Sequence, residues 1–183
     1  MRVKKIFLWA AGIVFAAFIA VVIYRIPHAV EQQKTAEAVA KIHATKLTLD
    51  DVMGKNLPPD PGLDANKTIE GVDANKNGIR DDVELAIFKK YPNSARIRAA
   101  ELQYAMALQN ELTSNVFNSE TLVAAIQEEG RGYLCIGKDK NITEVEQLVF
   151  NNESRRKVRE DIRKKYLVSF SLSSEPECDI SDL

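Results

Sequence analysis

The sequence predicts an all-α protein in which one N-terminal transmembrane helix precedes a small helical bundle. Three observations support this prediction. Ile6 to Tyr24 is an uncharged apolar run of 19 residues. Five later segments repeat apolar residues at intervals of three or four, as amphipathic helices do, and no segment of any length shows the strict alternation of a half-buried strand. We therefore expect one membrane segment followed by helices joined by short loops.

Composition limits the classes of function. With 183 residues and 45% hydrophobic content, the chain has room for a membrane segment and one compact domain. Its net charge is −1, and without Arg2, Lys4 and Lys5 it keeps 22 basic and 26 acidic residues, a balance of about −4 that argues against nucleic-acid binding. The chain has only two histidines, His28 and His43, so a histidine zinc site or catalytic triad has little support.

The apolar run, residues 6–24, is long enough to cross a membrane once. As a helix at about 1.5 Å per residue it nearly matches a hydrocarbon core of roughly 30 Å. Basic residues precede it, so the positive-inside rule places the N-terminus in the cytoplasm and the rest outside. A cleaved signal peptide, followed by secretion, is the alternative. Its apolar core is usually about 7–15 residues and its small-residue cleavage site follows promptly, whereas Ala36 and Ala38 come late, so we favour an uncleaved signal anchor.

The composition along the chain suggests four parts. Residues 1–26 form the cytoplasmic N-terminus and signal anchor, 27–62 a juxtamembrane helix and Pro-rich linker, 63–170 the helical domain, and 171–183 an acidic tail. A helix break is expected at Pro27. The helix beyond it is either a solvated spacer or the partner of another helix, and Leu47 to Gly54 is expected to form a short helical turn.

Apolar spacing places five helices in the domain, with the third interrupted around Gly130–Gly132. They are expected over 83–91, 94–112, 119–132, 143–150 and 158–166. The last helix and the three residues before it carry seven basic residues: Arg155, Arg156, Lys157, Arg159, Arg163, Lys164 and Lys165. A solvated face with intrahelical ion pairs explains them. An anionic lipid surface or an acidic partner is the other explanation.

The stretch 73–84 has the pattern of a calcium-binding loop. Side-chain oxygens occupy its first, third and fifth positions, a glycine its sixth, and carboxylates its ninth and twelfth. The expected ligands are Asp73, Asn75, Asn77, the backbone carbonyl of Ile79, Asp81 and Glu84.

Calcium needs about six to eight oxygens at roughly 2.3–2.6 Å, so a short peptide must curl around the ion and alternate inward oxygens with outward side chains. Gly78 permits the sharp positive-φ turn that this requires. Asp82 is expected to cap the following helix or to lie outside the ligand shell. With three carboxylates and two neutral amides, the affinity should be weak, around 10⁻⁴–10⁻³ M.

This segment resembles the EF-hand loop and its single-loop relatives, such as dockerin-type repeats, over these twelve residues only. The apolar residue stands at the seventh position, Ile79, where the family has it at the eighth, and no amphipathic helix precedes the loop. The wider pattern, Pro-Pro-Asp-Pro-Gly followed by the loop, is similar to one found in bacterial envelope proteins. The resemblance implies a half EF-hand in the periplasm, on a chain anchored in the bacterial inner membrane.

Two simpler readings of the loop region stay open. Asx-rich turns with glycine occur without metal, and Asp81 or Asp82 could merely cap a helix. Asp64-Ala-Asn66-Lys67 repeats nine residues later at Asp73, which most simply indicates a repeated turn, with Asp64 as a possible extra ligand.

Cys135 and Cys178 are the only cysteines. In an oxidising compartment an even pair favours a disulfide, which would hold the acidic tail. One buried thiol and one tail thiol is the alternative.

The function we expect is a membrane-anchored periplasmic calcium-binding protein, a structural or protein-interaction module with an unidentified protein partner and with Ca²⁺ as a structural ion. An envelope hydrolase using carboxylates such as Glu128, Glu129 or Asp81 is an alternative, although no nucleophile and base accompany them. A pilin-like secretion component is a further alternative, but pilins carry a glutamate at the fifth position of the apolar stretch, and no acid precedes Glu31 here.

Overall fold

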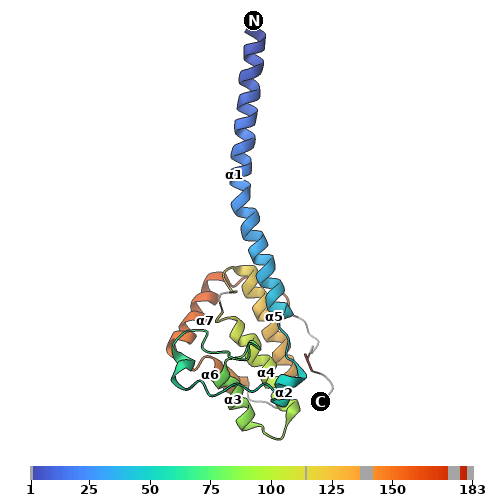
Figure 1. Cartoon of the computed structure of the whole chain (residues 1–183), viewed down its shortest axis with the longest axis vertical. Helices are drawn as coiled ribbons and strands as arrows, with labels where there is room; N and C mark the ends of the chain where they lie inside the picture. The colour runs from blue at the N-terminus through green and yellow to red at the C-terminus, as the bar shows by residue number, and fades with distance from the viewer. Residues whose placement is uncertain (1, 114, 137–141, 173–177, 181–183) are drawn as a thin grey trace. The chain divides into compact units, whose positions relative to one another are not determined.

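The structure is a computed structural model that describes residues 2–113, 115–136, 142–172 and 178–180, with side chains from Trp9 onward. These residues form seven α-helices and one 3-10 helix and no strand, which confirms the predicted all-α class (Figure 1). The chain divides into two compact units, Met1–Glu37 and Ala38–Leu183. The second unit is the helical domain.

Helix α1, Arg2–Ala44, contains the apolar run. Among the described residues its Trp9–Ala44 part is the one helix long and apolar enough to cross a membrane, and the most apolar stretch is fully exposed. A single-pass anchor and a signal sequence both have this property. The predicted break at Pro27 is wrong, since α1 continues through it. A helix can pass a proline by giving up one hydrogen bond and bending.

The compact unit begins earlier than the sequence indicates, at Ala38 and not near residue 63. Short helix α2, Leu49–Met53, follows the end of α1. Leu47 and Val52 on either side of its start are buried in the main core. Part of the expected linker therefore supplies core side chains, and the linker proper is shorter than predicted.

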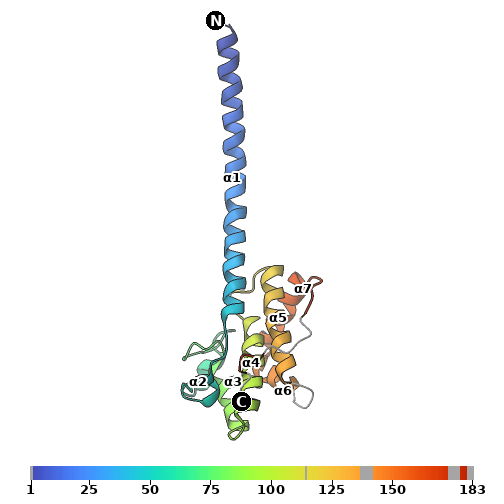
Figure 2. The ribbon, with the colours of Figure 1, turned by 90° about the vertical axis from the view of Figure 1, so that its right-hand side faces the viewer.

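The five predicted bundle helices are all present (Figure 2). A short 3-10 helix η1 precedes them. The bounds are η1 Gly62–Asn66, α3 Asp81–Lys90, α4 Ala95–Asn110, α5 Ser119–Ile136, α6 Ile142–Val149 and α7 Glu153–Tyr166.

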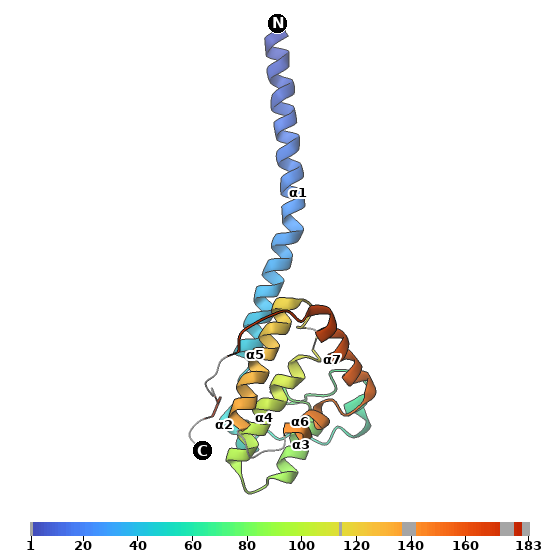
Figure 3. The same ribbon diagram turned by 180° about the vertical axis from the view of Figure 1, so that it is seen from behind.

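The interruption predicted at Gly130–Gly132 is wrong, because α5 is one continuous helix. Gly132 serves close packing instead. A Cβ atom built on it would lie 2.8 Å from the Cα of Tyr104 in α4, a distance that real Cβ atoms do not show. The missing side chain lets α4 and α5 lie side by side in the domain (Figures 1 and 3).

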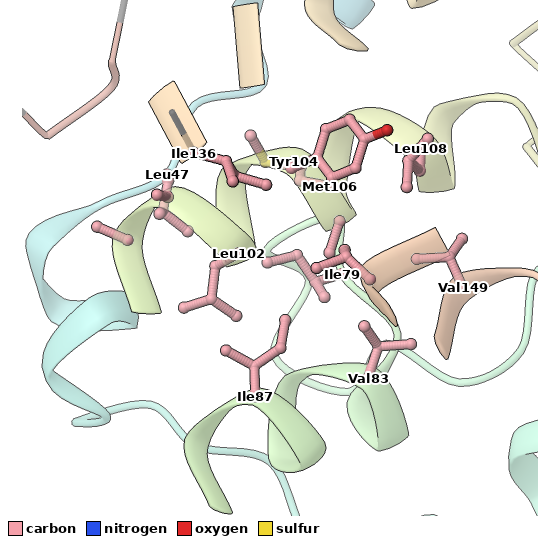
Figure 4. Close-up of a cluster of buried hydrophobic side chains, with 14 of the residues drawn as sticks. Leu47, Ile79, Val83, Ile87, Leu102, Tyr104, Met106, Leu108, Ile136 and Val149 are labelled. Carbon is pink, nitrogen blue, oxygen red and sulfur yellow. The ribbon is translucent and has the colours of Figure 1, made fainter. Parts of the chain in front are cut away.

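The main core lies between α3, α4 and α6, with residues from the loop before α3 (Figure 4). Its members include Ile79, Val83, Ile87, Leu102, Leu108 and Val149. A second cluster joins the end of α1 to α5 and α7 through Ile42, Leu122 and Ile162. The candidate calcium loop is therefore attached to the rigid part of the domain.

Cys135 and Cys178 form a disulfide with their Cα atoms 5.5 Å apart, as predicted. The bond holds the C-terminal segment against α5. Next to it, the Asp179 carboxylate accepts hydrogen bonds from the Leu47 N–H at 2.9 Å and from Arg131 at 3.0 Å. Residues 173–177 and 181–183 of the expected acidic tail lie outside the described residues.

Candidate functional site

The backbone of the loop 73–84 has the turn that its sequence predicts. Gly78 has φ +86° and Lys76 has φ +60°, both in the left-handed region. A Cβ on Gly78 would also lie 3.3 Å from the Cγ of Met106 in α4. A side chain at this position would therefore be both strained and crowded, which explains why the loop needs glycine there.

The first and fifth positions of the loop hold its backbone in place. The Asp73 carboxylate accepts hydrogen bonds from the N–H of Asn77 at 3.2 Å and of Gly78 at 2.9 Å. The Asn77 side-chain oxygen accepts one from the N–H of Ile79 at 2.9 Å. These contacts curl the loop around its own Asx side chains and turn the Asp73 carboxylate inward.

Ile79 anchors the loop to the domain. Its side chain is fully buried in the main core, and Figure 4 shows it among the side chains of that core. In the EF-hand pattern the apolar residue that packs into the core stands at the eighth position of the loop. Here Ile79, at the seventh position, packs into the core. That the Ile79 carbonyl oxygen binds the ion stays a prediction.

Asp81 is buried in the first turn of α3. Its Oδ1 accepts a hydrogen bond from the N–H of Ala74 at 2.9 Å, and its own N–H donates to the carbonyl of Val72 at 2.9 Å. Burial raises the pKa of the Asp81 carboxyl, and the charge of Asp73 raises it further. The two carboxylates are therefore near enough to repel each other.

Glu84 is the most unusual residue of the site. Its side chain is fully buried, and its Oε2 accepts a hydrogen bond from the Asn75 amide at 3.0 Å. Its Oε1 makes no hydrogen bond of good geometry. Burial raises the pKa of Glu84 to about 7, although the side chains of Asn75 and Asn77 lower it; the charges of Asp51 and Asp81 raise it by smaller amounts. An ionised carboxylate here lacks a compensating charge.

The amide groups of the loop face the opposite way from cation ligands. Asn75 donates its NH₂ to Glu84 and to the carbonyl of Asn56 at 2.9 Å. The NH₂ of Asn77 is buried and makes no hydrogen bond of good geometry, although the Asn77 side chain lies near enough to Glu84 to lower its pKa. A cation would need Asn75 and Asn77 to present oxygen, which a half-turn of each amide supplies.

Across the described part of the chain, no group of three or more His, Cys, Asp or Glu side chains is drawn together closely enough to hold a metal ion. In the loop the carboxylates of Asp73 and Asp81 are engaged by backbone N–H groups. Ion binding therefore requires a local closure of the loop around Glu84, in addition to the turn of the amides.

The structure rules out the capping role expected for Asp82 and has Asp64 in an exposed ion pair. Asp82 does not cap α3, whose N-cap is Arg80 without a side-chain bond, and it pairs with the Arg80 guanidinium instead. Asp64 lies outside the loop and pairs with Lys67 at 2.6 Å on the surface. Neither contributes a ligand to the loop.

Sequence reasoning missed Arg80, whose side chain is completely buried. It donates to the carbonyls of Leu148 at 2.8 Å and Val149 at 2.9 Å, at the end of α6. Arg80 therefore fastens the loop to α6. Its position inside an acidic loop gives no signal of this, because the acceptors are backbone carbonyls about 68 residues away in the sequence.

The sequence predicts that the basic side chains of α7 form a solvated face with intrahelical ion pairs. Only some of them do so. Arg156 and Lys157 form the expected intrahelical pairs with Glu153 and Asp161. Arg155, in contrast, is fully buried and donates to the carbonyls of Ala65, Thr68 and Ile69 and to the side-chain oxygens of Asn66 and Asn151. Arg155 therefore ties the segment before the loop to α7.

Arg159 and Arg163 turn inward as well. Arg163 contacts Glu111 and Glu129 at 2.5 Å each, and Arg159 contacts Glu129 at 3.2 Å. Burial, together with the neighbouring Glu111, raises the pKa of Glu129 to about 7. These two arginines are neutralised inside the domain.

The carboxylates considered for hydrolysis each have structural partners. Glu128 accepts a hydrogen bond from His43 at 2.7 Å and one from Lys46 at 3.1 Å. Burial raises the pKa of Glu128, but these hydrogen bonds outweigh it and hold the pKa below its usual range. Glu129 belongs to the arginine cluster above. This arrangement gives no specific support to a hydrolase.

Comparisons with protein-family models, with curated proteins and with solved structures find no match to this chain. The candidate function therefore depends on the geometry of the loop and on the apolar helix.

Proposed function

We propose that the protein is a membrane-anchored, extracytoplasmic calcium-binding protein in which the ion stabilises the loop 73–84. The observation that carries the proposal is the Oε1 atom of Glu84, which is buried, makes no hydrogen bond of good geometry and belongs to a carboxylate that faces neutral amides and the negative charge of Asp81. A buried carboxylate in that position is costly unless a cation or a proton compensates it. Calcium, with its preference for carboxylate and amide oxygens, suits the residues around it.

The ion would act as a fastener and not as a cytosolic sensor. Ile79 and Arg80 already fix one side of the loop to the core and to α6. An ion held by Asp73 and Glu84 would fix the other side to the first turn of α3. The expected affinity, about 10⁻⁴–10⁻³ M, suits a site that stays occupied outside the cytoplasm.

The anchoring part of the proposal rests on α1. Its apolar stretch is long enough to cross a bilayer, and the basic residues before it favour a cytoplasmic N-terminus. A helical domain held near the membrane in this way suits a structural or protein-interaction role. A reporter that is active only outside the cytoplasm, fused after Leu183, tests the orientation, and cross-linking in membranes tests for the partner.

The calcium site is tested by titrating the full chain, reconstituted in lipid nanodiscs, with Ca²⁺ in a calorimeter. We expect one ion per chain, and we expect Asp73→Ala to abolish the signal. Asp64→Ala is the matched control, because Asp64 is an exposed aspartate of the same sequence repeat. Binding that Asp73→Ala leaves unchanged would place the ion elsewhere and overturn the proposal.

A further inference from the structure

Basic and apolar side chains are exposed together where α7 ends. Lys164 and Lys165 lie in its last turn, and Leu167 and Val168 directly after it are 51% and 49% exposed. We call these four residues the α7 tip. Among the described residues neither lysine forms an ion pair, although the Lys165 ammonium lies 4.8 Å from the centre of the Tyr166 ring.

The tip differs from the rest of α7 because its positive charges are not neutralised within the domain. Arg155 is buried among carbonyls, and Arg159 and Arg163 are neutralised by buried glutamates. Of the seven basic residues of the helix, the two at its end are therefore the ones most available to an outside anion. Because exposed aliphatic side chains follow them at once, the tip has both elements of a peripheral membrane contact.

The tip lies at the end of the domain where the chain from the apolar segment enters. Tyr166 and Phe170 pack on the second cluster, which contains Ile42 from the end of α1. Val168 and Val39 line the same cavity of about 310 Å³. The tip is thus fixed beside the residues that connect the domain to the apolar run.

Chain length keeps the tip close to any membrane that holds the apolar run. Val39 comes thirteen positions after Ile26. This stretch spans about 20 Å as a helix and at most roughly 45 Å when fully extended. Both residues lie in α1, so the shorter distance applies. A bend or tilt of the helix, for example at Pro27, brings the tip to the membrane surface over this distance.

We propose that the α7 tip docks on anionic phospholipid headgroups of the membrane that holds the N-terminal helix. The two ammonium groups bind headgroup phosphates, and Leu167 and Val168 enter the boundary between headgroups and acyl chains. This inference rests on the proposed membrane anchoring but not on the calcium site. Docking would fix the face that the domain turns toward a partner.

Tryptophan fluorescence in vesicles tests the proposal on the full chain. Trp9 is the only tryptophan, so it reports insertion of the N-terminal helix when the lipids carry bromine, a contact quencher, on their acyl chains. Val168→Trp in a Trp9→Phe background reports the tip. Leu63→Trp in the same background is the matched control, because Leu63 is 90% exposed and lies in η1, which Arg155 holds near the other end of α7.

In brominated vesicles containing phosphatidylglycerol, we expect strong quenching of Trp9 and of the tryptophan at 168, and little at 63. Quenching at 168 should be lost on adding Lys164→Glu and Lys165→Glu, and it should fall in about 1 M salt, where the screening length is near 3 Å. Circular dichroism of each variant confirms that it folds.

The outcomes separate the two proposals. If Trp9 is not quenched, the membrane anchor is wrong and the docking proposal falls with it. If Trp9 is quenched but position 168 is quenched no more than position 63, anchoring holds and docking is refuted. Equal quenching at 168 in neutral phosphatidylcholine vesicles, unchanged by the two lysine substitutions, would refute recognition of anionic headgroups.

Discussion

Replacing Glu84 by glutamine should stabilise the protein without calcium and should abolish most of the stabilisation that calcium gives. Burial raises the pKa of Glu84 from its usual 4.5 to about 7. The folded state therefore binds this proton more tightly than the unfolded state does, and stability without calcium falls as pH rises from about 4.5 to 7. A shift of this size corresponds to about 3 kcal/mol. At pH 8 without calcium, Glu84→Gln should be more stable than the wild type by up to that amount.

Calcium should remove most of this difference, because it stabilises the wild type and not the variant. An ion at a hundredfold excess over its dissociation constant stabilises the folded state by about 2.7 kcal/mol. For a domain of this size that corresponds to roughly 5–11 °C in melting temperature. The glutamine variant lacks the closing carboxylate and should gain little. The assay is thermal unfolding of the full chain in nanodiscs at pH 8, with chelator or with about 10 mM calcium, a concentration above the expected dissociation constant.

Glu153→Gln is the matched control, since the Glu153 carboxylate is exposed and pairs with Arg156 at the surface. It should respond to calcium as the wild type does. Magnesium in place of calcium should give a smaller shift, because Mg²⁺ dehydrates reluctantly and demands octahedral geometry. The reasoning is refuted if calcium leaves the wild type unchanged, or if it stabilises Glu84→Gln equally.

Three further predictions concern the scaffold. Reducing the disulfide, which spans 43 residues, should lower the free energy of unfolding by about 4 kcal/mol; unchanged denaturant unfolding would contradict this. Arg155→Ala should lower the free energy of unfolding by about 3–5 kcal/mol, because it leaves buried carbonyls unpaired. The exposed Arg156→Ala should lower it by less than about 1 kcal/mol. Equal denaturant midpoints for the two variants would contradict this. Gly132→Ala should lower the free energy of unfolding by about 1–3 kcal/mol, because the added Cβ overpacks the contact with α4. Gly130→Ala should lower it less, because the Cβ there would meet a flexible leucine side chain.

The sequence was sufficient for the helices, because apolar residues at intervals of three or four are set by helix geometry itself. It was insufficient at Gly132, where local propensity favours a break but the close approach of α4 needs a residue without a Cβ. The early start of the domain was missed for a similar reason. Leu47 and Val52 flank a polar stretch, and only tertiary packing reveals that they are buried.

For the site, the sequence identified the turn at Gly78 and the inward Asp73, and it placed Glu84 in the first turn of a helix. The burial of Asp81 and Glu84 appears only in the structure. The sequence could not reveal Arg80, whose acceptors are backbone carbonyls and carry no sequence signal. The sequence also could not predict how the amide groups of Asn75 and Asn77 are oriented, because an asparagine can present its oxygen or its nitrogen in the same place.

The most direct test is a crystal structure of the protein grown in about 10 mM calcium, well above the expected dissociation constant. The proposal predicts an ion with oxygen ligands at about 2.3–2.6 Å, drawn from Asp73, Asp81 and both oxygens of Glu84, with the side-chain oxygens of Asn75 and Asn77 turned inward. A loop that stays free of metal at this concentration, with the Asn75 NH₂ still bonded to Glu84 as it is here at 3.0 Å, would contradict it.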